Sequence, residues 1–208
     1  MNISPYRRAL SIRRSLRERE AVFHRFGYNS KVALAFVIGR AIPLKGRILE
    51  IGTGKGRFLA LLSRHAKRIT TLDINPKEQQ LAQIGLPMQR QRTIRFVVHN
   101  AERLPWRNST FDSVLSVNTF HHLKDPLRVL QEMIRVVKPS GKIVLSDLSP
   151  RGLRIFERLH RCEGRSHPRP QHIFQCYWRR LLDHGLDVAY WKRCGQEVLV
   201  ASRKLLST

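Results

Sequence analysis

A glycine-rich stretch in the first third of the chain limits most strongly what this sequence can fold into. Arg47–Phe58 reads RILEIGTGKGRF, an apolar segment followed by three alternating glycines and then an apolar helical pattern. This order predicts a short buried strand over 47–51 that turns through glycines into a helix. Glycine lets a ligand approach the main chain closely, and a helix start offers unpaired N–H groups. We therefore predict a ligand-binding loop at the carboxyl end of the first strand of an open α/β sheet.

The glycine spacing separates this loop from two common nucleotide-binding loops. The dinucleotide fingerprint is G-x-G-x-x-G, whereas Gly52, Gly54 and Gly56 form G-x-G-x-G, and no Lys-Ser or Lys-Thr pair closes a P-loop. The motif E-x-G-x-G-x-G, which begins at Glu50, resembles motif I of the class I S-adenosylmethionine (SAM) dependent methyltransferases. Glu50 would suit the cationic ammonium and sulfonium of SAM. The alternative is a glycine-rich turn that binds no ligand.

Two further strands are predicted after the loop, each followed by a residue suited to adenosine. Arg68–Asp73 predicts the second strand, and an acidic group at its end can accept hydrogen bonds from two ribose hydroxyls. Ile94–His99 predicts the third strand, and the segment NAERLPW that follows it resembles the D-A-x-x-L-P-F segment of many SAM methyltransferases. Asn100 stands where Asp is usual, and its carbonyl can still accept a hydrogen bond from the adenine amino group. A plain polar loop is the alternative.

The longest run of matching motifs follows in the middle of the chain. Phe111–Val117 predicts a fourth strand, Asn118–Leu123 a loop, and Asp125 the N-cap of a helix with one apolar face. Lys138–Gly141 predicts a turn before a fifth strand over 142–147. The combined pattern F-D-x-V, H-H-L-x-D-P and L-x-E-M-x-R-V-x-K-P-x-G resembles the small class I methyltransferases closely.

The resemblance covers residues 30–147 and implies both a fold and a cofactor. The fold is α/β, a Rossmann-like open twisted sheet of seven strands with helices on both faces and the last inserted strand antiparallel. Asp187–Lys192 and Glu197–Arg203 would be its final two strands, with Gly195 in the turn between them. The implied cofactor is SAM, with S-adenosyl-L-homocysteine as its product. The positions carried over as cofactor contacts are Glu50, Gly52, Thr53, Gly54, Gly56, Asp73, Ile74, Asn100, Ala101 and Asn118.

At 208 residues, the chain is expected to form a single domain, 1–208, with a sizeable core. The resemblance divides it into an N-terminal helical lid (1–44), a SAM-binding core (45–147) and a C-terminal substrate-side half (148–208). A basic helix is predicted within residues 1–27, and a second helix capped by Ser30 runs to about Ala41. Tyr28 is the aromatic residue of interest in this lid, with a core or loop tyrosine as the alternative.

The longest apolar run, Val32–Ile38, is too short to span a bilayer and lies behind many charges, unlike a secretion signal. We predict a cytoplasmic protein without a transmembrane segment. The three cysteines are few and odd in number, so they indicate no disulfide framework. Cys162, His167, His172 and Cys176 are residue types that can bind zinc. Their spacing matches no finger pattern, and we expect packing or contacts with an anionic acceptor and no metal.

The net charge of +24 is unusual, and it is spread along the chain. Residues 1–40, 41–150 and 151–208 contribute +7, +10 and +7, so no separate basic tail carries the excess. Such a charge can attract nucleic acid, an anionic membrane surface or an acidic substrate. The alternatives are an arginine-rich proteome and a plain solubility charge.

Two adjacent histidines follow the fourth strand, where the resemblance places the methyl group. His121 or His122 could take a proton from a protic acceptor near neutral pH, or either could merely support the loop. The loop lacks the D-P-P-Y type of methyltransferases that act on exocyclic amines of bases, and no Pro-Cys nucleophile is present. Because the core resembles the ubiquinone-biosynthesis-like group, we predict an enzyme that transfers a methyl group from SAM to a small-molecule acceptor. The alternative is an RNA-associated methyltransferase or a SAM-dependent RNA-binding protein.

Overall fold

The sheet is built from apolar segments whose side chains are buried on both faces. β1 (Ile48–Ile51) is fully buried, and so is nearly all of β4 (Phe111–Val117), as expected for parallel strands covered on both sides by helices. In the computed structural model, the residues described are 5–164, 166 and 173–203. The other strands are β2 (Ile69–Asp73), β3 (Ile94–Val98), β5 (Val137–Leu148), β6 (Asp187–Arg193) and β7 (Gln196–Ser202).

The seven strands form one sheet in the order β3-β2-β1-β4-β5-β7-β6. β1 to β5 pair in parallel, while β7 pairs antiparallel with both β5 and β6. The predicted Rossmann-like sheet with an antiparallel inserted strand is therefore confirmed. Arg193 pairs with Gln196, so Cys194 and Gly195 form a two-residue hairpin loop, and both have positive φ, as a tight turn of this length requires.

The structure differs from the predicted turn at Lys138–Gly141. These residues belong to β5, and the pairing with β4 shifts register between Phe111 and Ser113. Phe111 lies opposite Val137, whereas Ser113 already lies opposite Lys142. The extra residues bulge out of the ladder, as a β-bulge does, and the strand continues beyond them.

Helices cover the sheet and close its carboxyl edge. Four of the described helices have an Asn, Asp or Ser side chain as N-cap. The predicted N-cap Asp125 is confirmed, because its side chain accepts a hydrogen bond from Arg128 N (2.9 Å). Asn29, and not the predicted Ser30, caps the second helix through Val32 N (3.1 Å). The helices are α1 (Pro5–Arg25), α2 (Ser30–Ala41), α3 (Arg57–Leu62), α4 (Pro76–Gly85), α5 (Met88–Gln91), the 3-10 turn η1 (Phe120–His122), α6 (Pro126–Val136), α7 (Pro150–Cys162) and α8 (Phe174–Asp183).

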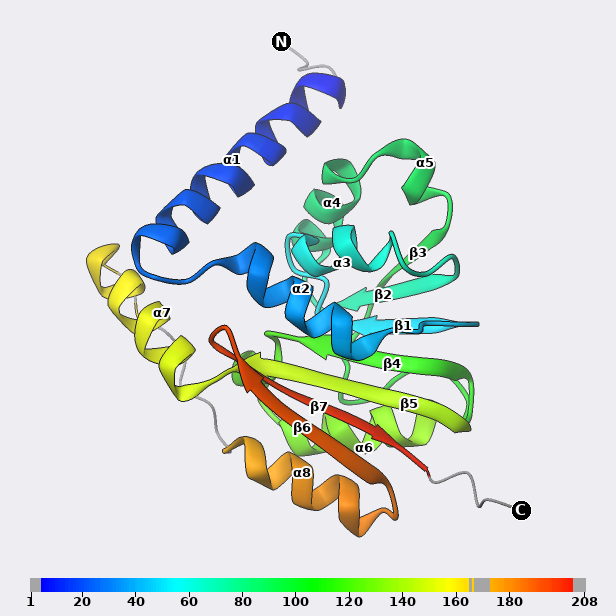
Figure 1. Ribbon diagram of the computed structural model, residues 1–208. Coiled ribbons are helices and arrows are strands. Elements are labelled where there is room, and N and C mark those ends of the chain that lie inside the picture. The colour runs from blue at the N-terminus through cyan, green and yellow to red at the C-terminus, as the bar shows by residue number, and fades with distance from the viewer. Residues whose placement is uncertain (1–4, 165, 167–172, 204–208) are drawn as a thin grey trace.

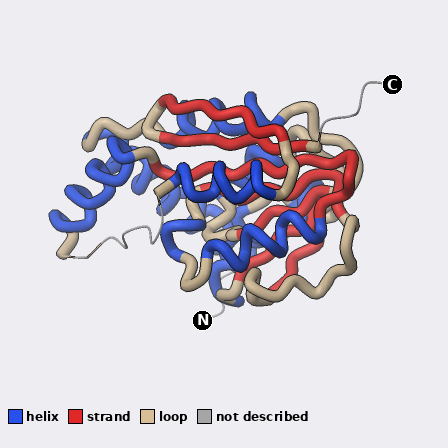
Figure 2. The backbone as a smooth tube through the Cα atoms, turned by 90° about the horizontal axis from the view of Figure 1, so that it is seen from below, coloured by secondary structure: helices blue, strands red, loops and turns tan. Residues whose placement is uncertain are grey.

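Two apolar cores lie on opposite faces of the sheet, and helices flank both sides (Figures 1 and 2). On one face, α6 and α8 pack their Met133 and Leu181 side chains against strands that include β4. On the other face, α2 and α3 pack Val37 and Leu59 against β1 and β2. Burial of these side chains is the main stabilising contribution to the fold.

A third, smaller apolar cluster lies beyond the carboxyl ends of the parallel strands. Phe23 of α1, Ala33 of α2 and Leu159 of α7 meet there with Leu148 and Tyr28. Figure 1 shows α1 (blue) and α7 (yellow) at this edge of the sheet. The basic N-terminal helix thus packs through its apolar residues over the edge at which open α/β sheets bind ligands.

The sequence raised the questions of a membrane-spanning helix and of a metal site, and the described part of the chain bears on both. None of the helices described is both long and apolar enough to cross a bilayer. His167 and His172 lie outside the described residues. Cys162 is exposed and Cys176 is half-buried. Within the ranges that the structure describes, no three His, Cys, Asp or Glu side chains are grouped so that they could hold a metal ion.

Candidate functional site

A cavity of about 500 Å³ opens at the carboxyl edge of the sheet. The glycine loop, the end of β4, η1 and helices α1, α2 and α7 contribute its walls. No Asp or Glu is among its described lining residues, whereas Arg19, Lys55 and Arg57 are. The lining also contains the polar or aromatic residues Phe23, Tyr28, Thr53, Asn118, His121, His122, Phe156 and His160.

The three glycines of the loop differ in what a side chain at each position would meet. A Cβ on Gly52 would collide with the Thr119 hydroxyl, and a Cβ on Gly56 would lie 2.9 Å from Ala82 Cβ of α4. A Cβ on Gly54 would meet no heavy atom within 4 Å. Gly52 and Gly54 line the cavity, while Gly56 lets two helices approach each other. Gly54 is therefore where the loop leaves room for a ligand beside the main chain.

Asp73 lies against the glycine loop at the end of β2. Its Oδ2 accepts a hydrogen bond from Gly54 N (2.7 Å), and its Oδ1 accepts one from Asn75 N (2.9 Å). Ile74 beside it is 68% exposed, an unusual position for a large apolar side chain. The half-buried Asp73 carboxylate can accept hydrogen bonds from the hydroxyls of a sugar ring, and the exposed Ile74 side chain can pack against a flat apolar group attached to that ring.

Glu50 is buried below the loop and is not among the described residues that line the cavity. Its Oε2 accepts a hydrogen bond from Thr71 Oγ1 (2.6 Å), and the Thr71 and Thr53 hydroxyls lie 2.5 Å apart. Gln79 Nε2 of α4 donates to Thr53 Oγ1 (3.0 Å). Burial raises the pKa of Glu50 to about 8, partly offset by the hydrogen bond from Thr71. The network fixes the loop from beneath, while burial favours the neutral form of Glu50.

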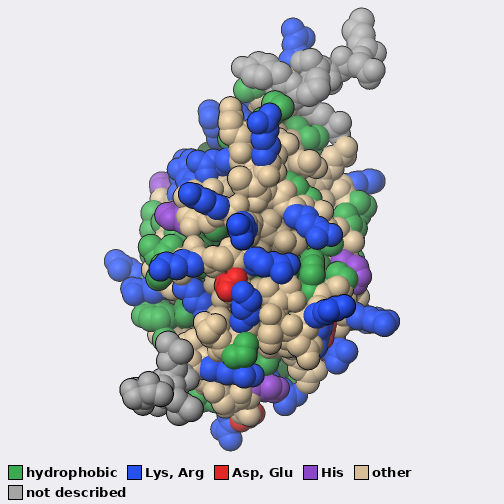
Figure 3. Space-filling view, turned by 90° about the vertical axis from the view of Figure 1, so that its right-hand side faces the viewer, with side chains coloured by type: hydrophobic (Ala, Val, Ile, Leu, Met, Phe, Trp, Pro, Cys, Tyr) green, Lys and Arg blue, Asp and Glu red, His purple; other side chains and the backbone are tan. Residues whose placement is uncertain are grey.

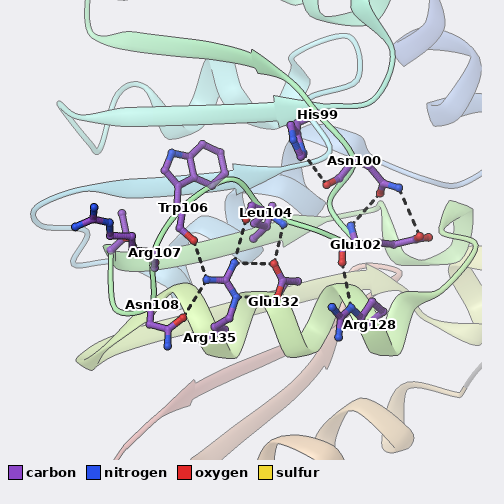
Figure 4. A network of polar contacts seen from close by, with 11 residues as sticks. His99, Asn100, Glu102, Leu104, Trp106, Arg107, Asn108, Arg128, Glu132 and Arg135 are labelled. Carbon is purple, nitrogen blue, oxygen red and sulfur yellow. Dashed lines mark hydrogen bonds and ion pairs between the residues drawn. The ribbon is translucent and has the colours of Figure 1, made fainter.

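Asn100 is exposed at the start of the loop between β3 and β4 (Figure 4). Its Oδ1 already accepts a hydrogen bond from Glu102 N (2.9 Å), which leaves the second lone pair of that oxygen. Ala101 follows it with its side chain 7% exposed. Asn100 and Ala101 are not among the described lining residues of the cavity, so their contact with adenine stays a prediction.

A charged pair on α6 anchors this β3–β4 loop (Figure 4). Glu132 Oε2 accepts hydrogen bonds from Leu104 N and Arg135 Nη2, each 2.7 Å long. Arg135 donates in turn to the Trp106 and Leu104 carbonyls at 2.7 and 3.0 Å. The hydrogen bonds from Arg135 hold the pKa of Glu132 below its usual value. The loop that carries Asn100 is thus held by charge-assisted hydrogen bonds.

Asn118 has a strained conformation at the end of β4. Its φ is 54°, which is uncommon for a residue with a Cβ. Its Oδ1 is buried and has no hydrogen-bond partner among the described residues. Because a buried unpaired carbonyl oxygen is costly, its position on the cavity wall indicates a ligand donor as its natural partner.

His121 is held in one orientation by Asp147 of β5. The ring Nδ1 lies 2.5 Å from Asp147 Oδ1, and His121 N donates to Asp147 Oδ2 at 2.9 Å. Leu148 N donates to the same carboxylate at 2.8 Å. Both side chains are more than nine-tenths buried. A carboxylate with these donors favours the tautomer with Nδ1 protonated, so Nε2 carries the ring lone pair.

His122 differs from its neighbour although the residue type is the same. Its side chain is exposed, and its ring lies 4.0 Å from the His121 ring, centroid to centroid, at an angle of 44°. Both rings line the cavity. The buried, carboxylate-bound His121 is therefore better fixed as a base than His122.

Tyr28 and Arg57 contribute polar groups that the motifs did not assign to the site. Tyr28 is 3% exposed, its oxygen accepts a hydrogen bond from Gln196 Nε2 (2.7 Å), and burial raises its pKa to about 12. Arg57 lies with Cζ 5.0 Å from the centroid of the Phe23 ring. Its Nε is buried without a hydrogen-bond partner in the described structure, and burial lowers the pKa of its guanidinium.

Sequence reasoning missed Asp147 and Arg57 as site residues. Asp147 is 26 residues from His121, and only the pairing of β4 with β5 brings the two side chains together. Arg57 directly follows the last motif glycine, and a cation in the first turn of a helix was the signal that could have drawn attention to it. The role of Asp147 is recognisable only in the fold.

The cavity fits a SAM-sized ligand in three respects. Gly54 leaves open space beside the loop main chain, and the unpaired Asn118 Oδ1 can accept from a ligand. Asp73, in contact with the same loop, offers carboxylate oxygens of the kind that bind ribose hydroxyls. Both polar groups are hydrogen-bond acceptors, of the kind that the ammonium and hydroxyl groups of such a ligand require.

Comparison with known proteins agrees with this geometry. Residues 49–145 match the family model described as "Methyltransferase domain". The chain is thus similar to methyltransferase domains over this segment, which is slightly less than half of its length. The matched segment begins in β1 and ends in β5, so it contains the glycine loop, Asp73, the β3–β4 loop and both histidines.

Two curated relatives show how much of the chain is shared. The chain is 36% identical over 108 residues to phthiotriol/phenolphthiotriol dimycocerosates methyltransferase of Mycobacterium leprae, covering 50% of the chain and 38% of the relative. It is 30% identical over 155 residues to malonyl-(acyl-carrier protein) O-methyltransferase of Marinomonas sp., covering 72% of the chain and 57% of the relative. The chain thus spans less than two thirds of the length of each relative.

A solved structure extends the likeness of the fold beyond the matched segment. The YcgJ protein of Bacillus subtilis superimposes with a TM-score of 0.63 at 22% identity, over 78% of this chain and 71% of that protein. At this identity the likeness concerns the fold alone.

Proposed function

We propose that this protein is a SAM-dependent methyltransferase that acts on a small molecule. The observation that carries the proposal is the cavity at the carboxyl edge, which is lined by the glycine loop and by His121. Asp73 accepts a hydrogen bond from that loop, and Asp147 orients His121. SAM, when bound, supplies a methyl carbon made electrophilic by its sulfonium, and S-adenosyl-L-homocysteine is the product. The names of the two curated relatives specify different acceptors, phthiotriol or phenolphthiotriol dimycocerosates and malonyl-(acyl-carrier protein), so they support the reaction class without identifying this acceptor.

The cofactor is held, in this proposal, by residues on the ends of the first four strands. Asp73 accepts from the ribose hydroxyls, and Asn100 with the Ala101 backbone meets the adenine beside Ile74. Gly52, Thr53 and Gly54 pass along the methionine part, with Gly56 fixing the turn into α3. Asn118 Oδ1 accepts from the ammonium group or from the acceptor. Glu50 acts through Thr71 and Thr53 and stabilises the loop.

His121 is the proposed general base. Asp147 fixes the ring through Nδ1, so Nε2 takes the proton that a hydroxyl acceptor loses as its oxygen bonds to the methyl carbon. SAM, when bound, would supply the methyl group, and the proton taken up by Nε2 would leave the positive charge on the His121 imidazole. His122, exposed at the cavity wall, has a lesser role in positioning the acceptor.

The acceptor site lies, in this proposal, under α1, α2 and α7. Helices α1 and α7 contribute Phe23, Arg19, Phe156 and His160 to the cavity lining, and Arg57 at the start of α3 lines the same cavity. Arg19 pairs with Glu163 outside the lining, whereas no Asp or Glu is among the described lining residues. Aromatic surface beside Arg57 and His160 suits an acceptor that has an apolar body and an anionic group. We infer that residues 1–44 act as the lid and that residues 148–208 complete the acceptor side of a single domain in a cytoplasmic enzyme.

The second candidate is an RNA-associated methyltransferase, which the net charge of +24 favours. The two functions differ in the molecule that receives the methyl group. A direct test incubates the protein with SAM labelled in its methyl group and with separate pools of quinols, fatty acids, acyl thioesters and total RNA. Label in one small-molecule pool, with one S-adenosyl-L-homocysteine formed per methyl group, supports the first candidate. Label in RNA alone contradicts it.

A further inference from the structure

A second hollow lies at the opposite, amino-terminal edge of the sheet. It measures about 520 Å³ and is lined by the starts of β1, β2 and β3. Five of its nine lining residues are cations, and none of those described is an acid. The cations are Arg47, Lys67, Arg68, Arg92 and Arg95. We call these five residues the amino-edge groove.

Strand pairing brings these cations together from three distant segments. Ile48 N donates to Arg68 O (2.9 Å), and Ile69 N donates to Thr93 O (3.3 Å). Arg95 of β3 pairs with Thr70 of β2. Because neighbouring strands lie about 4.8 Å apart, the starts of the three strands place the cations in a short row. The cations of this row repel one another, which destabilises the arrangement, and an anionic partner would offset that repulsion.

The charges of the groove are open to solvent and largely uncompensated. All five cations are exposed. The carboxylate that adjoins the groove is Asp112, whose Oδ2 accepts from Arg47 N and whose Oδ1 pairs with Lys138 Nζ, both at 2.7 Å. Asp112 is therefore already paired within the protein, and it neutralises a lysine outside the groove.

The groove is part of a wider basic face. Figure 3 looks at the side of the molecule toward which the amino ends of the parallel strands point, and Lys and Arg side chains are spread over it with few acids. A small anion would need only the groove. A basic field of this breadth matches a long polyanion with regularly spaced charges.

We propose that the amino-edge groove binds the phosphodiester backbone of duplex nucleic acid. Four of its five cations are arginines, whose planar guanidinium pairs two-fold with phosphate oxygens. No aromatic residue is among its described lining residues, so the groove lacks the stacking surface with which proteins hold single-stranded bases. The contacts are to the backbone, and they confer binding without sequence preference.

The groove is separate from the methyl-transfer cavity. The parallel strands run from one to the other, and the five residues of β2 alone span roughly 17 Å. Nucleic acid seated in the groove is thus a docking partner, and the acceptor cavity stays accessible while it is bound. The proposal does not depend on which acceptor the enzyme uses.

The test compares two full-length variants that carry the same change in net charge. The groove variant replaces Arg68, Arg92 and Arg95 by Gln, and the control replaces Arg151, Arg154 and Arg158 on α7 by Gln. All six arginines are exposed, and each variant has a net charge of +21. Binding of short fluorescein-labelled duplex DNA and duplex RNA is followed by fluorescence anisotropy over a series of NaCl concentrations. Poly-glutamate serves as an acidic-protein competitor, and S-adenosyl-L-homocysteine binding checks that each variant is folded.

We expect the groove variant to lose at least about tenfold in affinity for a duplex. The slope of log affinity against log salt concentration should become shallower by the amount that corresponds to about 2 to 3 phosphate contacts. The control should keep nearly the wild-type slope. A difference between duplex DNA and duplex RNA identifies which one docks. Equal losses in both variants, a wild-type protein that binds neither duplex, or displacement by poly-glutamate at matched charge would each overturn the proposal.

Discussion

The two edges of the sheet are both basic, yet they are built differently. At the carboxyl edge, several polar groups are buried and have fixed partners, as in the His121–Asp147 contact and the Glu50–Thr71 hydrogen bond. At the amino edge, Arg68 and Arg92 are exposed cations on the surface. Buried groups with fixed partners can direct chemistry at one atom, because their geometry is determined by the fold. Exposed cations can only attract, and salt screens that attraction.

The largest effect is expected from removing the fixed base. His121→Ala should lower turnover roughly 10²- to 10⁴-fold, the usual contribution of general base catalysis, and leave S-adenosyl-L-homocysteine affinity unchanged. His122→Ala is the matched control and should lower turnover far less. Both are measured by methyl transfer to the acceptor that the labelled screen identifies. Equal losses in the two variants would remove the distinction between the histidines.

Asp147→Asn tests whether the Asp147 carboxylate positions the His121 ring. The amide cannot stabilise the imidazolium, so turnover should fall and the pH profile should shift, whereas a merely structural role would leave the profile in place.

The buried acid should make stability depend on pH. The pKa of Glu50 rises to about 8 on folding from about 4.5, so the folded state binds a proton that the unfolded chain releases. The free energy of unfolding should therefore fall as pH rises between about 5 and 8, by up to about 1.4 kcal/mol per pH unit. Glu50→Gln keeps an oxygen for Thr71 and should flatten this dependence. Urea unfolding at a series of pH values measures it, and parallel curves for the two proteins would show that Glu50 is ionised in the fold.

The loop contact at Asp73 should have an intermediate effect. Asp73→Ala removes the oxygens proposed for the ribose and the acceptor for Gly54 N, so affinity for S-adenosyl-L-homocysteine should fall about 10- to 100-fold. Asp112→Ala, which removes a carboxylate at the other edge, is the control and should leave this affinity unchanged. Calorimetric titration of both variants measures the difference. A wild-type affinity in Asp73→Ala would mean that the ribose lies elsewhere.

The smallest effect is expected at the amino edge. Replacing the exposed Arg68, Arg92 and Arg95 by Gln should change stability by less than about 0.5 kcal/mol each, because no described partner is lost. Because the substitutions remove repulsion between like charges, the triple variant should be slightly more stable than the wild type at low salt. At high salt the difference in stability should be negligible. Thermal unfolding at two salt concentrations measures it. A clear loss of stability would show that these arginines have a structural role.

The elements that the sequence predicted well are those set by local patterns. The apolar run before Gly52 and the proline after Asp125 specify a strand end and a helix start whatever surrounds them. The turn expected at Lys138–Gly141 was wrong because a bulge depends on how β5 pairs with β4. Strand pairing is a long-range property that no local window contains.

The same reason limits what could be predicted of the two sites. Glycine loop residues are contiguous, so a motif identifies them. His121 was a candidate from its position, but its partner Asp147 comes from another strand. The groove cations come from three segments that only the parallel register brings together. Sites made from one segment are visible in a sequence, and sites made across strands become visible in the fold.

The measurement that tests the central claim most directly is a calorimetric titration of the purified protein with S-adenosyl-L-homocysteine. We predict saturable binding of one ligand per chain with a dissociation constant in the micromolar range, weakened by Asp73→Ala and unaffected by the groove variant. Absence of binding by folded protein, shown by a cooperative unfolding transition in the same sample, would contradict the assignment of the carboxyl-edge cavity as the cofactor site.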